Sequence, residues 1–293
     1  MDFVIADLEW NGAYSKKAHG YFNEIIEIGA VKLDASLREI GRFRVMIRPT
    51  VTPKLSKLVT ELTHISKEEL EDGGVTFAQA FSRLRRWIGG PAVFLTWSTT
   101  DLLVLLENFR YYYRMEELPF LSHYVDLQAY FQQRSNIGAG QQIGLSRAAE
   151  MLGIEAQDLA SHRALDDSDL TARILQKVYE PHSFDAVTAV CDETFYRRIT
   201  FKNTVLSDPD DTRIDWSRAV YDCPACGKPL RRNGKWKFYN RAFCAEFTCK
   251  KCKQKYTARF QCRLRFEGME YKLKVNPKKQ PSEQVVEPAA SET

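Results

Sequence analysis

The sequence predicts an α/β protein in which helices flank a mixed five-stranded sheet, with a small β-rich module joined to it. Three observations lead to this fold class. Short apolar runs come first and strand–helix alternation follows, which is the order expected of a mixed sheet. The 293 residues suffice for one domain of ordinary size and a smaller module. Five of the seven cysteines fall between residues 223 and 252, which gives that module an expected metal site.

The elements of the larger domain are predicted from periodicity. Apolar runs and the alternation of apolar with charged residues predict strands over residues 3–8, 23–34, 40–48, 92–97 and 125–127. Apolar residues at helical spacing predict helices over residues 77–88, 102–114, 145–152 and 164–179. A capping box from Ser66 to Glu69 opens a further short helix.

Composition divides the chain into four parts. These are an α/β domain of residues 1–182, a connector of residues 183–219, a zinc module of residues 220–275 and a disordered tail of residues 276–293. Residues 1–217 carry 24 Lys and Arg against 31 Asp and Glu, whereas residues 218–279 carry 18 against 4. A strongly basic module beside an acidic body favours a polyanionic partner, although a solvated basic surface has the same composition.

The sequence contains no recognisable targeting or membrane segment. Residues Met1 to Asp7 are predicted to form a strand, without the charged stretch and apolar run of a signal peptide. No apolar run approaches the length needed to cross a bilayer. We therefore expect a cytoplasmic protein without a membrane partner.

Three groups of residues are candidates for an acidic metal site. Asp7 and Glu9 lie two apart at the end of the first strand, so both side chains point to one face, where two unpaired carboxylates are costly to bury. A solvated strand edge explains this pair equally well. Asp101 follows the fourth strand, where an acid in the first turn of a helix is also common because it complements the helix dipole.

The third group places a histidine before an acidic helix start. His162 precedes the regular helix, and Asp166 and Asp167 face different sides of its first turns. A surface histidine beside an acidic helix start is the structural alternative.

Together these residues resemble the three motifs of DEDDh exonucleases in the DnaQ-like, ribonuclease-H-like superfamily. The motifs are Asp7-Leu-Glu9, Asp101 and His162-x4-Asp167, and the resemblance covers about residues 1–182. Supporting matches are Glu27-Ile-Gly-Ala30, Arg48-Pro49, Leu62-Thr-His-Ile65, Gly144-Leu145 and Leu152-Gly153. The Leu-Asp-Asp pattern after His162 is most similar to the Eri-type RNA exonucleases and their bacterial KapD-like relatives.

This resemblance implies a ribonuclease-H-like fold and a 3′→5′ exonuclease. The implied substrates are the 3′ ends of single-stranded nucleic acid, with RNA favoured over DNA, and the implied products are nucleoside 5′-monophosphates. Two alternatives are a DNA-trimming or proofreading exonuclease and a non-catalytic nucleic-acid-binding regulator with the same fold.

The resemblance also implies a role for each site residue. Asp7 would bridge two Mg²⁺ or Mn²⁺ ions, Glu9, Asp101 and Asp167 would complete their ligand shells, and His162 would act as the general base. Asp166 is the rival for the last ligand, but the His-x4-Asp spacing favours Asp167.

Two positions depart from the family pattern. Trp10 stands where Thr or Ala is usual, and His64 replaces a usual Gly. Both are expected near the terminal nucleotide of a bound substrate, so both are candidate nucleic-acid contacts. A packing role for Trp10 is equally consistent with the sequence.

The smaller module is expected to be a zinc ribbon that binds nucleic acid. Cys223, Cys226, Cys249 and Cys252 form two CxxC pairs that predict one structural Zn²⁺. Cys244 is a spare without a CxxC partner. Positive charge alternates with aromatic rings at Lys235, Trp236, Lys237 and Tyr239, which favours contacts to phosphates and bases. Half-buried strands of a small β module have the same pattern.

Overall fold

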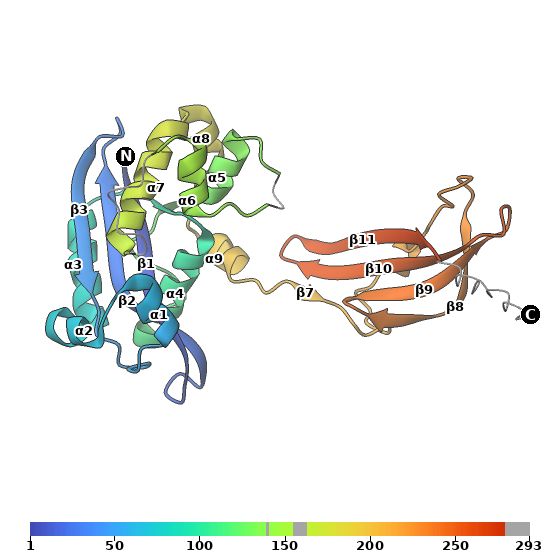
Figure 1. Ribbon diagram of the computed structural model, residues 1–293, viewed down its shortest axis with the longest axis horizontal. Helices are drawn as coiled ribbons and strands as arrows, with labels where there is room; N and C mark the ends of the chain where they lie inside the picture. The colour runs from blue at the N-terminus through green and yellow to red at the C-terminus, as the bar shows by residue number, and fades with distance from the viewer. Residues whose placement is uncertain (139–140, 155–162, 279–293) are drawn as a thin grey trace, which may run out of the picture. The chain divides into compact units, whose positions relative to one another are not determined.

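The computed structural model describes residues 1–138, 141–154 and 163–278. The chain forms two compact units, Met1–Thr200 and Phe201–Thr293, and each is described by itself (Figure 1). His162 and the end of the expected disordered tail, residues 279–293, lie outside the described residues.

The first unit is built on a six-stranded mixed sheet with the order β3-β2-β1-β4-β5-β6. Its strands are β1 (Asp2–Ser15), β2 (Gly20–Leu33), β3 (Glu39–Met46), β4 (Ala92–Thr96), β5 (His123–Asp126) and β6 (Ala189–Val190). Strands β1 to β3 pair antiparallel, whereas β1–β4 and β4–β5 pair parallel. The mixed α/β class is confirmed. The sheet has one strand more than expected because the two-residue β6 pairs antiparallel with β5.

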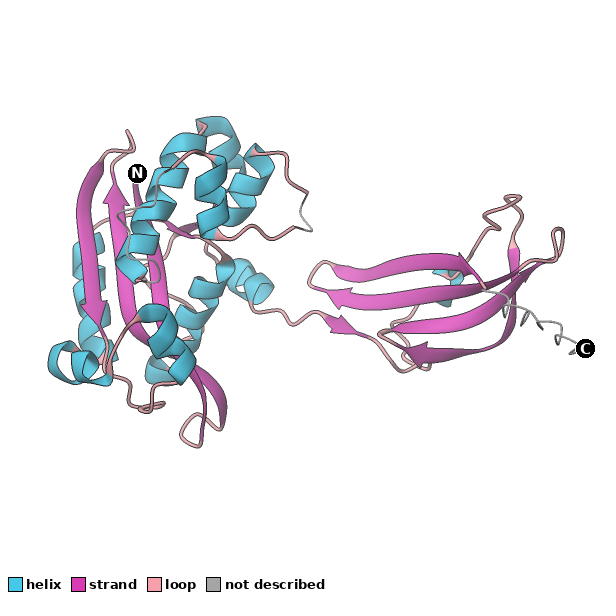
Figure 2. Ribbon diagram, viewed as in Figure 1, coloured by secondary structure: helices cyan, strands magenta, loops and turns pink. Residues whose placement is uncertain are grey.

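Helices cover both faces of this sheet (Figures 1 and 2). They are α1 (Lys57–Thr63), α2 (Lys67–Gly73), α3 (Phe77–Ile88), α4 (Thr99–Tyr113), α5 (Leu127–Arg134), α6 (Leu145–Met151), α7 (Ala164–Val178), α8 (Pro181–Val187) and α9 (Glu193–Ile199). Val4 and Ala6 of β1 pack with α3 and α4, and Phe3 and Ile5 pack with α5, α6 and α7 on the other face. Among the described residues, no helix is both long and apolar enough to cross a bilayer.

Local capping explains where the predicted helices begin and end. The Ser66 hydroxyl accepts a hydrogen bond from the Glu69 amide at 3.0 Å, so the expected cap of α2 is present. A complete capping box, with both reciprocal hydrogen bonds, joins Thr76 and Gln79 at the start of α3. Gly89 ends α3 with a φ of 76°, a backbone conformation that favours glycine.

The first unit extends beyond residue 182, where the sequence had placed the end of the α/β domain. Residues 183–200 belong to this unit and include most of α8, all of β6 and α9. Phe184 and Tyr196 are buried in its two cores, which explains why this segment does not form a connector.

The second unit is a five-stranded antiparallel sheet in which β7 (Thr204–Val205) pairs with the third of four longer strands. The longer strands are β8 (Leu230–Tyr239), β9 (Ala242–Cys249), β10 (Lys255–Arg265) and β11 (Gly268–Pro277). A short 3-10 helix, Trp216–Arg218, precedes them. Leu206 and Ile214 are buried in the core of this unit, so the unit includes much of the predicted connector.

Candidate active site and cysteine metal centre

Strand β1 directs Asp7 and Glu9 toward the face of the sheet covered by α7. Both residues have the same parity as Phe3 and Ile5, which pack on that side. Across the antiparallel pair, Asp7 lies opposite Gly29 and Glu9 lies opposite Glu27. The two carboxylates therefore share one face, as the spacing predicts.

Gly29 allows α7 to approach the sheet directly beside Asp7. A Cβ atom at this position would overlap the backbone of Ala164 and Leu165 at the start of α7. Only glycine permits such a close approach without moving the helix. Gly29, the third residue of the Glu27-Ile-Gly-Ala30 match, thus has a physical role that spacing alone does not reveal.

Glu27 holds the first turn of α7 in place. Its buried carboxylate accepts hydrogen bonds from the Arg163 guanidinium at 2.9 and 3.1 Å and from the Ala164 amide at 3.3 Å. Arg44 donates to the same carboxylate at 2.5 Å. Since α7 has no side-chain cap of its own, Glu27 caps it from the neighbouring strand. Sequence reasoning missed this role because the contact spans 136 positions.

Asp101 enters the site from the first turn of α4. Ser98 caps this helix, and the Asp101 Oδ1 accepts a hydrogen bond from the Leu8 amide at 3.2 Å. Leu8 stands between Asp7 and Glu9, so this bond ties Asp101 to the two acids of β1. Asp101 is buried, with 7% of its surface exposed.

Asp167 completes an acidic cluster with the two acids of β1. One ligand oxygen each from Asp7, Glu9 and Asp167 lies within 4.8 Å of the others, which is the geometry of a site that can hold a metal ion. Asp166 is absent from this cluster and faces the charges of Arg44 and Glu27. The structure thus brings Asp167 to the site rather than Asp166.

The electrostatics of this acidic cluster favour a bound cation. Burial, followed by repulsion from Asp101 and Asp167, raises the pKa of Asp7 well above its usual value. Burial and then Asp167 raise the pKa of Glu9 to about 8, and burial raises the pKa of Asp101 to about 7. Carboxylates held so close keep their charge near neutral pH only when cations neutralise them.

The acidic cluster lines a cleft of about 550 Å³. Beside the four acids, the cleft is lined mainly by apolar side chains, among them Trp10, Leu58, Val59, Leu62, Trp97 and Leu145. Trp10 therefore lines the cleft and also packs against the core, while its contact with a nucleotide stays a prediction. His64 is exposed, and its φ of 56° ends α1 in the left-handed conformation that a glycine usually supplies.

Two buried polar residues hold the wall of this cleft. The Glu24 carboxylate accepts hydrogen bonds from the amides of Thr50 and Val51 at 2.6 and 2.9 Å. The Asn11 side chain accepts one from the Ser56 amide at 3.0 Å, and Ser56 is the cap of α1. Because α1 supplies Leu58, Val59 and Leu62 to the cleft, these bonds position the wall opposite the acids.

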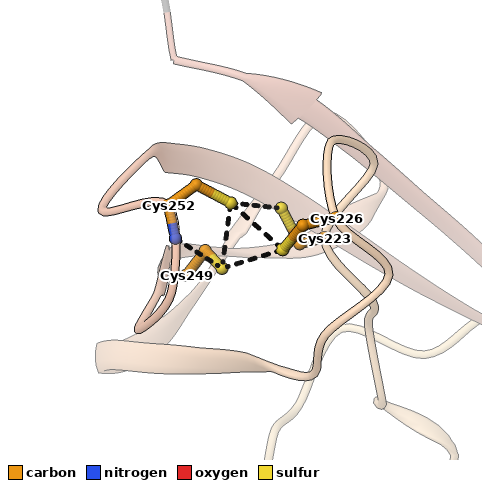
Figure 3. A group of neighbouring side chains, drawn as sticks. All are labelled: Cys223, Cys226, Cys249 and Cys252. Carbon is orange, nitrogen blue, oxygen red and sulfur yellow. Dashed lines mark hydrogen bonds between the residues drawn. The ribbon is translucent and has the colours of Figure 1, made fainter.

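Four cysteines of the second unit form a compact group (Figure 3). The sulfur of Cys252 lies 3.6, 3.1 and 3.4 Å from the sulfurs of Cys223, Cys226 and Cys249, respectively. A tetrahedral zinc site with Zn–S bonds of about 2.3 Å has sulfurs about 3.8 Å apart, so the group fits one Zn²⁺ after a small expansion. Cys244 is not part of it.

The two CxxC turns have the same backbone design. The Gly227 amide donates to the Cys223 carbonyl at 2.8 Å, and the Lys253 amide donates to the Cys249 carbonyl at 2.9 Å. Both Gly227 and Lys253 have positive φ values, 66° and 60°. This repeated turn points both sulfurs of each pair inward. The Tyr256 hydroxyl contacts the Cys223 sulfur and lowers the pKa of that thiol to about 6, which favours the thiolate that binds metal.

The four residues of this unit that were predicted to contact nucleic acid differ in their exposure. Lys235, Lys237 and Tyr239 are exposed, with Tyr239 at 71%. Trp236 instead packs in the core, stacked on Trp216 with ring centroids 5.5 Å apart. Because Lys237 lies on the opposite face, alternation along β8 places the Trp236 ring on the core face, which is the packing role that the half-buried-strand alternative gives it.

Comparison with known proteins places the first unit in a family. The family model described as Exonuclease (RNase_T) matches residues 4–175, more than half of the 293 residues. The chain therefore belongs to the RNase_T exonuclease family, as its three motifs imply.

Particular relatives share part of this chain. ERI1 exoribonuclease 2 of Xenopus laevis is 32% identical over 178 residues, which cover 53% of this chain and 25% of the relative. The Mus musculus protein of the same name is 30% identical over 208 residues, covering 60% and 28%. The chain thus spans about a quarter of the length of the curated relatives it matches.

Solved structures share the fold. The nuclease domain of 3′hExo, a DEDDh family member bound to rAMP, has a TM-score of 0.51 and 22% identity, covering 60% of this chain and 90% of that chain. A 3′-exonuclease that recognises the 3′ end of a histone mRNA stem-loop has a TM-score of 0.51 and 20% identity, covering 64% and 84%. At these identities the likeness concerns the fold alone, which is ribonuclease-H-like.

Proposed function

We propose that this chain is a 3′→5′ exonuclease that hydrolyses phosphodiester bonds from the 3′ end of single-stranded nucleic acid. RNA is the favoured substrate, and nucleoside 5′-monophosphates are the products. The observation that carries the proposal is the convergence of Asp7, Glu9, Asp101 and Asp167 at one cleft from three separate parts of the chain.

The donor set suits divalent cations. Hard ions such as Mg²⁺ and Mn²⁺ prefer carboxylate oxygens, which Asp7, Glu9 and Asp167 offer within 4.8 Å of one another and Asp101 offers beside them. When bound, two such ions supply Lewis-acid stabilisation of oxyanions and lower the pKa of a coordinated water.

The remaining steps fall to side chains of the chain itself. His162 is proposed to take the proton of the attacking water, because an imidazole titrates near neutral pH. Glu27 and Gly29 position α7, and with it Asp167, against the two acids of β1. The apolar cleft wall of α1 limits water around the reacting group and offers a surface for a nucleobase.

The preference for RNA is supported by the relatives. The curated relatives are named exoribonucleases, and one fold neighbour is bound to rAMP. The four-cysteine group is proposed to hold one structural Zn²⁺, which stabilises a unit whose own core is small.

The test compares neighbouring acids. Purified protein is incubated with 5′-labelled RNA and DNA, single- and double-stranded, with Mg²⁺ or Mn²⁺. We expect stepwise shortening from the 3′ end of single-stranded RNA, lost in Asp167→Asn and retained in the matched control Asp166→Asn. Equal activity of both variants, or no hydrolysis by the wild type on any substrate, would refute the proposal. Faster shortening of DNA would favour the DNA-trimming alternative.

A further inference from the structure

The sheet of the second unit has its core on one face. Tyr256, Ala258, Phe260 and Cys262 of β10 are buried, and Trp216 packs on Phe260 with ring centroids 5.6 Å apart. Side chains alternate between the two faces of a strand, so the residues between these four point to the opposite face. We call this opposite face of β8–β11 the open face.

Strand register extends the open face over all four long strands. Residues directly opposite one another in antiparallel strands share a face, and Lys237 lies opposite Cys244, Cys244 opposite Arg259, and Arg259 opposite Lys274. The cations that share this face are Arg231, Lys237, Lys255, Arg259, Arg263, Arg265, Lys272 and Lys274. The acids that share it are Glu246 and Glu270.

The ion pairs of the open face leave its centre positive. Glu246 pairs with Lys278 at 2.5 Å, and Glu270 pairs with Arg265 at 2.5 Å. Within the described ranges, no acidic side chain forms an ion pair with Arg259 or Lys274. Arg259 instead donates to the Asn240 carbonyl at 2.7 Å.

The central pair is unfavourable for folding alone. Arg259 and Lys274 lie directly opposite each other, and like charges in that position destabilise a sheet. An anionic partner removes this repulsion. Small or uncharged residues, Cys244, Thr248 and Thr257, separate the cations, so an extended chain can approach the backbone of the sheet.

We propose that the open face binds the sugar–phosphate backbone of single-stranded nucleic acid, a partner class that rests on the proposed function of the first unit. Cations on neighbouring strands, about 4.8 Å apart, match a partner with repeated charge better than a single anion. Tyr239, opposite Ala242 at the end of β8, adds one exposed ring at the margin. Contacts through phosphates imply binding with little sequence preference and strong dependence on salt.

The experiment measures binding without hydrolysis. Full-length protein is titrated against a 5′-fluorescent single-stranded RNA in buffer without Mg²⁺ and Mn²⁺, at several salt concentrations. The test variant is Arg259→Gln/Lys274→Gln. The matched control, Lys250→Gln/Lys251→Gln, removes two exposed charges from the turn beside the open face. We expect the test variant to bind about tenfold more weakly at low salt, with the slope of log K on log salt reduced by about 1.4.

The matched control and a charge-conserving exchange distinguish an effect of these two positions from an effect of net charge. The exchange Arg259→Lys/Lys274→Arg should bind like the wild type, and zinc content should equal that of the wild type in every variant. Equal losses in the test variant and in the matched control would mean that only net charge matters, and would overturn the proposal. Unchanged RNA binding by the test variant would also overturn the proposal. So would a test variant that binds RNA normally and loses binding only to vesicles of phosphatidylserine and phosphatidylcholine, measured in parallel. If the double variant loses zinc, Lys274→Gln alone on the exposed strand β11 provides the same comparison, with a slope change of about 0.7.

Failure here is distinguishable from failure of the proposed function. Salt-dependent binding that needs Arg259 and Lys274 in a chain without hydrolysis would support the open face and reject the exonuclease. Hydrolysis of short RNA, together with RNA binding that does not change when both residues are replaced, would support the exonuclease and reject the open face.

Discussion

Removing one carboxylate from the acidic cluster is expected to stabilise the metal-free protein above neutral pH. Burial and the charge of Asp167 raise the pKa of Glu9 from 4.5 to about 8. The folded state therefore holds this proton more tightly than the unfolded chain does. The contribution of protonated Glu9 to the unfolding free energy is complete below pH 4.5 and is lost as the pH rises through 8. Glu9→Gln removes this titration while conserving the shape of the side chain.

The magnitude follows from the shift in pKa. A difference between 4.5 and about 8 corresponds to about 5 kcal/mol of unfolding free energy at most, at 1.36 kcal/mol for each pH unit. Water in the open cleft screens part of this, so we expect Glu9→Gln to be more stable than the wild type by about 2 kcal/mol at pH 9. For a unit of this size the midpoint of unfolding rises by about 4–8 °C.

The assay is thermal unfolding between pH 5 and 9 in buffer without Mg²⁺ and Mn²⁺, followed by addition of Mn²⁺. The wild type should lose stability relative to Glu9→Gln as the pH rises, and Mn²⁺ should restore the wild type far more than the variant. A difference between the two proteins that stays constant from pH 5 to 9 would refute the electrostatic account of the acidic cluster.

Three further predictions concern residues that shape the two sites. Gly29→Ala should lower the unfolding free energy of the first unit by about 2 kcal/mol or more, because its Cβ would overlap the backbone of α7, whereas Gly90→Ala, with nothing within 4 Å, should not; calorimetry compares them. Glu27→Gln should reduce exonuclease turnover about 10–100-fold by loosening Arg163 and the start of α7, and unchanged turnover would argue against a positioning role. Cys249→Ser should lose zinc and the cooperative unfolding of the second unit, while the unfolding of the first unit stays intact. Metal analysis and hydrogen exchange measure the two effects, and a variant that keeps zinc and protected amides in the second unit would contradict this prediction.

Local patterns predicted much of the first unit. The side-chain cap at Ser66 and the apolar repeat of α3 are confirmed because both depend on residues three or four apart. Strand β1 is longer than predicted, ending at Ser15, because Asn11 and Ser15 are buried against the segment of Val51 and Thr52. No local pattern reveals that burial.

The acidic residues of the cleft could be predicted from the sequence, whereas the residues that position them could not. Asp7, Glu9, Asp101 and Asp167 stand in short motifs with a chemical order, which the sequence contains. Glu27 caps a helix far away in the chain, so its role depends on the paired sheet. The open face likewise depends on register, which places Arg259 beside Lys274. Trp236 was assigned to nucleic acid because its neighbours are basic, yet those neighbours share the opposite face of β8 and its ring packs against the core.

The most direct test counts divalent ions at the cleft. Electron paramagnetic resonance would follow Mn²⁺ binding to the wild type and to Asp7→Asn at pH 7.5, each with a nucleoside 5′-monophosphate present. We predict that the wild type binds two ions per chain with release of protons, because several acids of the site carry raised pKa values. Asp7→Asn should bind them far more weakly. Equal Mn²⁺ binding by both proteins, or none by either, would contradict the central claim. That claim assigns the carboxylates of Asp7, Glu9, Asp101 and Asp167 as the ligands of a hydrolytic metal site.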